Sequence, residues 1–232
     1  MHTETAPERT LTRAKLKTPR AAALAGIIFS VLLGVALTLI HISVPGDPLE
    51  QGEWLTSRLA SVVIGLNLVP FAGIAFLWFM GVVRDRLGER EDQFFSTVFF
   101  GSGLLFLAML FASIAVGGGV LIAYEAYPEQ LVSSGTYTLA RAISYQIMNV
   151  YAFRMAAVFM ISTCTIAVRT DIFPRWMALV GYVLALALLV SLGVTRWLTL
   201  VFPVWVLIIS LHILLQKPAP AHTVPVPADD GA

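Results

Sequence analysis

Charged residues are scarce in this chain of 232 residues. Lys, Arg, Asp and Glu make up 12% of it, while 58% of the residues are hydrophobic. An ordinary soluble domain carries about 25% charged residues, so the composition excludes a typical water-soluble protein. The formal net charge of +1 provides no basic surface for a polyanion, and we expect no nucleic-acid partner.

Cysteines and catalytic motifs are scarce as well. The only cysteine of the sequence is Cys164, so neither an intrachain disulfide nor a thiolate metal cluster can form. The sequence contains no HExxH, no GxSxG, no Walker loop and no dinucleotide-binding glycine loop, and no pair of carboxylates lies inside an apolar segment. These absences favour a protein that is not an enzyme, and the sequence predicts no cofactor and no metal site.

The most prominent feature of the sequence is a series of long apolar segments. A helix of about 20 residues crosses a bilayer, and six such runs fit the chain. We therefore predict an all-α, polytopic transmembrane bundle in residues 21–216, preceded by a basic tail (1–20) and followed by a proline-rich tail (217–232). The predicted spans are about 21–44, 59–83, 94–123, 140–168, 174–194 and 197–215.

The basic residues predict the orientation of these six helices. Eleven of the fifteen lie in the tails or in the connectors after the second and fourth spans, whereas Arg58, Arg141 and Arg196 lie on the opposite side. By the positive-inside rule, both termini are expected in the cytoplasm of a cell whose inner or plasma membrane holds the protein. The lipid bilayer is the first expected partner.

One arginine lies far from either end of its span. Arg154 is 14 residues from the start of the fourth predicted helix, about 20 Å along its axis. A central arginine costs about 2.5–3.5 kcal/mol on insertion scales, and all fourteen carboxylates lie in tails, in connectors or at a span end. The hydrogen-bond acceptors that the Arg154 guanidinium needs are therefore either other groups of the protein or a bound anion. Candidate residues around Arg154 are Gln146, Asn149 and Tyr151 on the same helix and Asn67 near Pro70 on the second.

Two functions follow from these patterns. The first is a small transporter, or a permeation or binding protein, with a polar intramembrane site around Arg154 for an anionic solute or lipid head group. The alternative is a non-catalytic scaffold, regulator or partner subunit that can form homo-oligomers. Its contacts would use small residues at every fourth position of the first helix, which let helices approach closely: Ala22, Gly26, Ser30, Gly34 and Thr38.

The stretch IFPRWMALVGYVLALALL, residues 172–189, opens the fifth predicted helix with a proline and an arginine. This entry and the six-helix layout resemble uncharacterised bacterial integral membrane proteins of families with unknown function. The resemblance implies a six-helix membrane fold and no particular activity or site residue.

Overall fold

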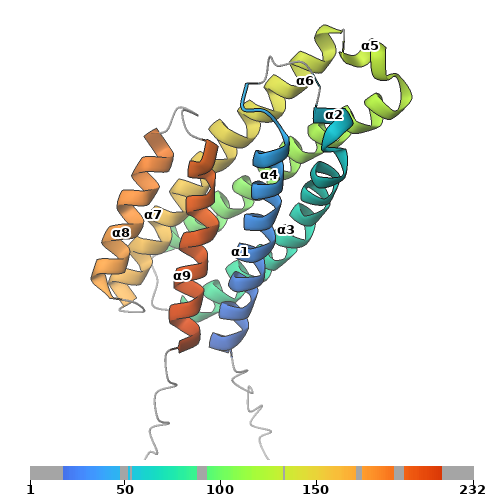
Figure 1. The fold of residues 1–232 in the computed structure, drawn as a ribbon. Helices are drawn as coiled ribbons and strands as arrows, with labels where there is room; N and C mark the ends of the chain where they lie inside the picture. Colours follow the sequence, from blue (N-terminus) through green and yellow to red (C-terminus); the bar gives the residue numbers. More distant parts are fainter. Residues whose placement is uncertain are drawn as a thin grey trace, which may run out of the picture.

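The computed structural model describes residues 18–47, 52, 54–87, 93–132, 134–170, 174–190 and 196–215. These residues form helices and short connections without any strand, which confirms the predicted all-α class for the described part of the chain (Figure 1). The predicted basic tail, apart from the first residues of α1, and the proline-rich tail lie outside the described residues.

The helices follow one another with short connections. In chain order they are α1 (Thr18–Ser43), α2 (Trp54–Ser57), α3 (Leu59–Leu87), α4 (Gln93–Ala126), α5 (Pro128–Val132), α6 (Gly135–Gln146), the π-helical turn η2 (Ile147–Ala152), α7 (Phe153–Thr170), α8 (Arg175–Val190), the 3₁₀ turn η3 (Arg196–Leu200) and α9 (Val201–Leu215). Segments α6, η2 and α7 run on as one long helix of changing type.

Five helical segments are long and apolar enough to cross a membrane. They are Ala21–Ser43, Leu59–Arg84, Ser96–Ala126, Gly135–Arg169 and Trp197–Leu215. The remaining predicted span corresponds to α8, an apolar helix of 16 residues. At 1.5 Å per residue its length is about 24 Å, less than the roughly 30 Å of a hydrocarbon core.

The helices pack as two groups that meet mainly where α3 contacts α4. Helix α1 packs against α3 and α9, while α4 packs against α7, α6 and η2 as well as α3. Helix α8 lies at the edge of the bundle, against α7 (Figure 1). Helices α4 and α6 extend beyond the others toward α5, so we call this the α5 end and the opposite end, where α1 begins and α9 stops, the terminal end.

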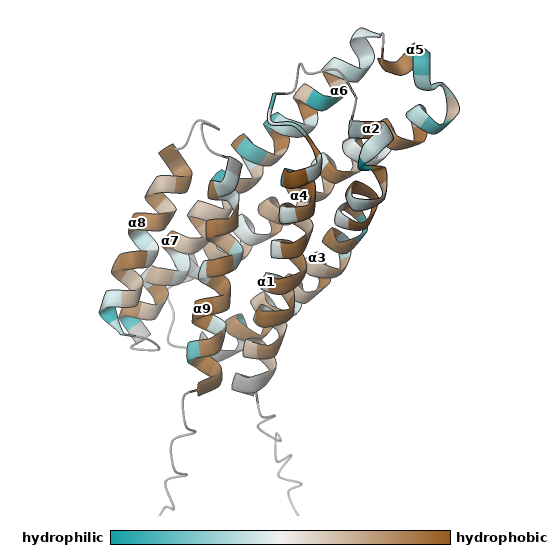
Figure 2. Cartoon of the chain, in the orientation of Figure 1, coloured by the Kyte–Doolittle hydropathy of each residue, from teal (hydrophilic) through white to brown (hydrophobic). Residues whose placement is uncertain are grey.

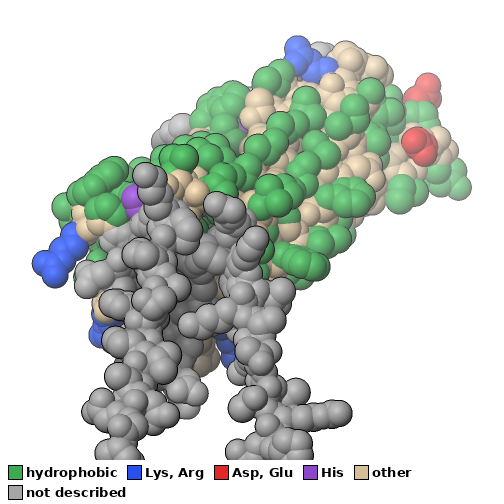
Figure 3. Space-filling view, turned by 90° about the horizontal axis from the view of Figure 1, so that it is seen from below, with side chains coloured by type: hydrophobic (Ala, Val, Ile, Leu, Met, Phe, Trp, Pro, Cys, Tyr) green, Lys and Arg blue, Asp and Glu red, His purple; other side chains and the backbone are tan. Residues whose placement is uncertain are grey.

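Apolar side chains cover the sides of the bundle as well as its interior. Brown, hydrophobic residues run along most of α1, α3, α4 and α9 (Figure 2), and side chains as large as Phe71 and Trp78 are exposed. Seen from below, the visible sides are mostly apolar, with acidic residues at the far end (Figure 3). Large exposed apolar surfaces of this kind are typical of helices that face lipid.

Aromatic rings fill the middle of the bundle. The phenylalanine cluster comprises Phe29, Phe76, Phe79, Phe99, Phe106, Phe153, Phe159 and Phe202, all almost completely buried. Phe76 lies at its centre, with ring centroids 4.6 Å from Phe29, 5.1 Å from Phe159 and 5.6 Å from Phe106. Lipid tails are as apolar as these rings, so close packing and ring geometry, at about 0.5–1.5 kcal/mol per pair, stabilise the contacts more than burial does.

The small residues of α1 are used within this chain at the terminal end. Gly26 is buried, and a Cβ there would overlap the Ser210 hydroxyl of α9 and lie 2.9 Å from a ring carbon of Phe79 in α3. At Gly34, by contrast, a Cβ would meet no atom within 4 Å. The glycine at position 26 therefore permits the close contact of α1 with both neighbours.

A second, smaller cluster lies at the α5 end. The short helix α2 packs against α3, α4 and α6 through Trp54, Leu55, Val62, Val120, Leu121 and Tyr137. Trp54 donates an indole hydrogen bond of 3.0 Å to the Tyr137 hydroxyl. This pair fixes the start of α6 over the connection between α1 and α3, where a cavity opens.

Candidate functional site

A cavity of about 110 Å³ lies at the α5 end of the bundle. Five parts of the chain form it: the end of α1 with the connection that follows, Trp54 of α2, the first half of α3, the second half of α4, and the α6–η2 segment. Its walls are mainly apolar, with Ile40, Val62, Leu66, Ile114 and Met148 among them. An engineered cavity of about 150 Å³ holds a benzene molecule with six non-hydrogen atoms, so this smaller one accepts a ligand of about four or five.

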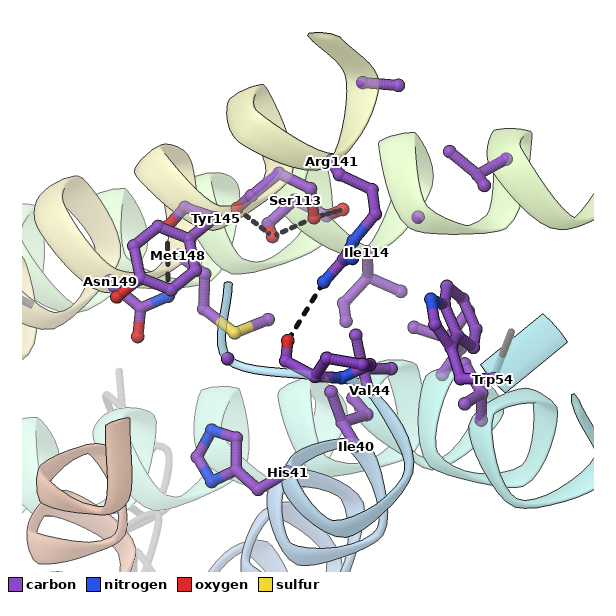
Figure 4. A pocket seen from close by; sticks show the side chains of 18 residues that line it. Ile40, His41, Val44, Trp54, Ser113, Ile114, Arg141, Tyr145, Met148 and Asn149 are labelled. Atoms are coloured by element: carbon purple, nitrogen blue, oxygen red, sulfur yellow. Dashed lines mark hydrogen bonds between the residues drawn. The ribbon is translucent and has the colours of Figure 1, made fainter. Parts of the chain in front are cut away.

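Arg141 of α6 brings a positive charge to the cavity. Its Nη2 donates a hydrogen bond of 3.0 Å to the carbonyl oxygen of Pro45, across the space between α6 and the end of α1 (Figure 4). The guanidinium carbon lies 5.8 Å from the ring centre of Trp54 and 5.9 Å from that of Tyr137, within cation-π range. The carbonyl and the two rings together hold the guanidinium at the cavity wall.

Two serines join the helices that form one side of the cavity. The Ser113 hydroxyl of α4 donates to the Ser144 carbonyl at 2.8 Å, and the Ser144 hydroxyl of α6 donates to the Ser113 carbonyl at 3.0 Å. Small side chains let α4 and α6 approach, and the reciprocal hydrogen bonds fix their register. The wall that carries Arg141 is therefore rigidly attached to α4.

The π-helical turn η2 forms the deeper part of this wall. Met148 and Asn149 both line the cavity, and the Met148 thioether points into it (Figure 4). The Asn149 amide donates to the Tyr145 carbonyl at 3.0 Å, which leaves its carbonyl oxygen as an acceptor. Single π turns inside α-helices occur frequently at functional sites.

Of the five residues predicted to surround an anion, Asn149 lines this cavity and the other four do not. Asn67 is exposed on α3, where its amide donates to the Val63 carbonyl of the same helix at 2.8 Å. Gln146 and Tyr151 are exposed and Arg154 is half-buried. Within the described part of the chain, no hydrogen bond, ion pair or ring contact joins the Arg154 side chain to another residue.

The π turn explains why Asn149 separates from the others. A regular α-helix turns by about 100° from one residue to the next. A π turn closes i→i+5 hydrogen bonds and inserts one extra residue, so the parts of the helix before and after it are rotated by about 100° relative to a regular helix. Asn149 consequently faces the cavity, while Gln146 and Tyr151 lie on the exposed side.

The cavity also contains polar residues that were not predicted as a site. Arg141 entered the sequence analysis only as a marker of orientation, and Ser144 and Tyr145 did not enter it. The sequence pattern that could have identified these residues is a spacing of three and four positions, which places them on one helical face. This face of α6 and η2 carries Arg141, Ser144, Tyr145, Met148 and Asn149. No group of three or more His, Cys, Asp or Glu among the described residues is arranged to hold a metal ion.

Comparisons with known proteins found no matching family model, no matching curated protein and no matching solved structure.

Proposed function

We propose that this chain is a six-span integral membrane protein that binds a small organic anion in the cavity at the α5 end, as a solute-binding or transport protein of a cell membrane. In this proposal the termini lie in the cytoplasm and the α5 end faces outward. The six spans are the five long apolar helices and α8, and the distribution of Lys and Arg along the sequence supports the orientation.

The observation that carries the function is a cation held at the wall of a mainly apolar cavity. A carboxylate can accept paired hydrogen bonds from a guanidinium, and the apolar walls then receive the rest of the molecule. From Arg141 to Asn149 the helix advances about 12 Å, enough for a carboxylate at one end and a short hydrocarbon chain at the other. A monocarboxylate of about two or three carbons, which has four or five non-hydrogen atoms, fits the volume.

Stabilisation of the purified protein by such carboxylates tests this binding. A ligand of about four or five non-hydrogen atoms is expected to bind weakly, with Kd on the order of 1 mM, so concentrations up to about 100 mM are needed. At 100 times Kd the protein gains about 2.7 kcal/mol of stability. We expect the rise in melting temperature to be largest at two or three carbons and to fall for longer chains.

Neighbouring glycines of α4 provide a matched pair of variants. Gly117 lines the cavity, and a Cβ there would lie 3.7 Å from a Leu66 methyl group that faces the same space. Gly119 is exposed, with no atom within 4 Å of such a Cβ. Gly117→Leu should fill the cavity and abolish the carboxylate effect, whereas Gly119→Leu should retain it. Equal binding by both variants would rule out the cavity as the site.

Variants of Arg141 test separately whether its positive charge contributes to binding. Arg141→Gln should remove the preference for a carboxylate over the corresponding alcohol, while Arg141→Lys should retain part of it, because lysine keeps the charge without the planar pair of donors. Uptake of the best ligand into liposomes then separates a transporter from a binding protein. Stabilisation without uptake identifies the latter.

The number of spans has a direct test. With six spans, reporter domains fused to the two termini lie on the same, cytoplasmic side of the membrane. With only the five long helices crossing, they lie on opposite sides. Reporters on opposite sides would show that α8 does not span the membrane.

The scaffold alternative depends on the small residues of α1. Its glycine at position 26 is covered by Ser210 and Phe79 of the same chain, so this half of the stripe is not available to a partner. The cavity therefore supports a binding function better than the stripe supports an assembly function.

A further inference from the structure

Exposed residues form a continuous line along the outside of α6, η2 and α7. Leu139, Ile143, Gln146 and Tyr151 are exposed, and Arg154 is half-buried. The steps between them are four, three, five and three residues. Three and four are the spacings of neighbours on one face of an α-helix, and the step of five crosses η2, where i→i+5 bonds bring residues five apart above one another. The π turn thus keeps Gln146, Tyr151 and Arg154 on one outer face.

This outer face brings a cation into a membrane-spanning segment. Arg154 lies within the span Gly135–Arg169, and no described residue pairs with its side chain. Among the described side chains the carboxylates are those of Asp47, Glu125 and Glu129, all at the α5 end of the bundle and none near the middle of a span. A second copy of this chain would bring another arginine to the same depth and no carboxylate near the middle of a described span.

We propose that Gln146, Tyr151 and Arg154 bind the head group of an anionic phospholipid from the leaflet at the α5 end. Side chains of a helix lean toward its N-terminus, which directs the Arg154 guanidinium toward Tyr151 and the α5 end. A phosphate accepts paired hydrogen bonds from a guanidinium. Gln146 lies about 12 Å further along the helix, where its amide can contact the glycerol or head group. The proposal rests on the membrane placement given above and not on ligand binding in the cavity.

Lipid retention measures this interaction. The protein is reconstituted with equal amounts of phosphatidylglycerol and phosphatidylcholine, extracted with mild detergent, and its bound lipids are counted by native mass spectrometry. We expect phosphatidylglycerol to be enriched on the unmodified protein. Arg154→Gln should lower this enrichment by about five- to tenfold, and Arg154→Lys by less. The control Arg175→Gln removes an exposed arginine at the start of α8 and should leave the enrichment unchanged.

Additional measurements keep the test decisive if Arg154→Gln does not fold. Gln146→Leu changes an exposed position and should lower the enrichment about two- to threefold in a folded protein. Unchanged enrichment in the Arg154 variants and in Gln146→Leu would overturn the proposal. So would loss of a copurifying protein, instead of lipid, from Arg154→Gln, because the acceptor would then be a partner's carboxylate.

Failure of this proposal is distinguishable from failure of the cavity proposal. Gly117→Leu should lose the carboxylate effect and keep the bound phosphatidylglycerol, whereas Arg154→Gln should do the reverse. A single variant that removes both interactions would show that the two sites are one, and would overturn the assignment of Arg154 to lipid.

Discussion

Replacing Gly26 by alanine should destabilise the protein, although the same replacement at Gly34 of the same helix should stabilise it. Both positions are inside α1, where alanine in place of glycine contributes about 0.5–1 kcal/mol. At Gly34 the new methyl group meets no atom within 4 Å, so this gain is retained. At Gly26 the methyl overlaps the Ser210 hydroxyl and lies 2.9 Å from a Phe79 ring carbon.

Overpacking of a well-packed core costs about 1–3 kcal/mol. Once the gain from alanine in the helix is subtracted, Gly26→Ala should lower the free energy of unfolding by up to about 2 kcal/mol. The free energies of unfolding of Gly26→Ala and Gly34→Ala should differ by about 1–3 kcal/mol. Reversible unfolding by sodium dodecyl sulfate in mixed micelles measures this difference. For a chain of this size each kcal/mol corresponds to about 2–4 °C in melting temperature.

A double-mutant cycle identifies the atom responsible. The Ser210 hydroxyl is buried and makes no hydrogen bond to the described residues, so Ser210→Ala alone should be neutral or stabilising. Combined with Gly26→Ala it should recover about 1 kcal/mol of the loss. If Gly26→Ala proves as stable as Gly34→Ala, the close contact of α1 with α9 is not formed and the packing described above is wrong.

Two other contacts lead to predictions of the same kind. Gly181→Ala in α8 should destabilise the protein by about 1–3 kcal/mol, because its methyl overlaps the Cys164 sulfur and lies 2.9 Å from the Trp205 indole nitrogen. Cys164→Ala should reverse part of this loss in the same unfolding assay. The buried Cys164 thiol should react with a maleimide only on unfolding, so rapid labelling of the folded protein would contradict the burial. Tyr137→Phe leaves the Trp54 indole without its acceptor at a cost of about 1–3 kcal/mol, and a melting temperature equal to that of the unmodified protein would count against the 3.0 Å hydrogen bond.

The all-helical architecture was accessible from sequence because the apolar runs have the length of a membrane span. Apolar runs of bilayer length must satisfy their backbone groups within the segment, so composition and length already indicate helices. The helix α3 illustrates this: a helix was predicted over 59–83, and the structure continues it to Leu87 through Pro70. Packing partners were not accessible in this way, because each apolar helix presents similar side chains on every face.

The cavity was hidden from sequence for two physical reasons. The contacts of Arg141 with Pro45 and Trp54 join residues far apart in the chain, with Pro45 96 positions away, and they exist only because α6 lies over the connection between α1 and α3. The π turn carries no local mark, since the residues from Ile147 to Ala152 are ordinary in a helix. Tertiary packing selects the turn, and the turn decides which side Asn149 faces. Whether Arg154 and its predicted neighbours bind an anion stays a prediction.

The phenylalanine cluster has an electrical consequence for the proposed binding. It lies nearer the terminal end than the cavity: the cavity is lined by residues 62 and 66 of α3, whereas the cluster uses Phe76 and Phe79 of that helix. Packed rings conduct no ions, so most of a transmembrane voltage falls across them. An anion that reaches Arg141 from the α5 end crosses little of this voltage, and its affinity should hardly depend on membrane potential. If the anion moved past Phe76 to the terminal end, its charge would cross most of the voltage, and its free energy would change by about 2.3 kcal/mol per 100 mV.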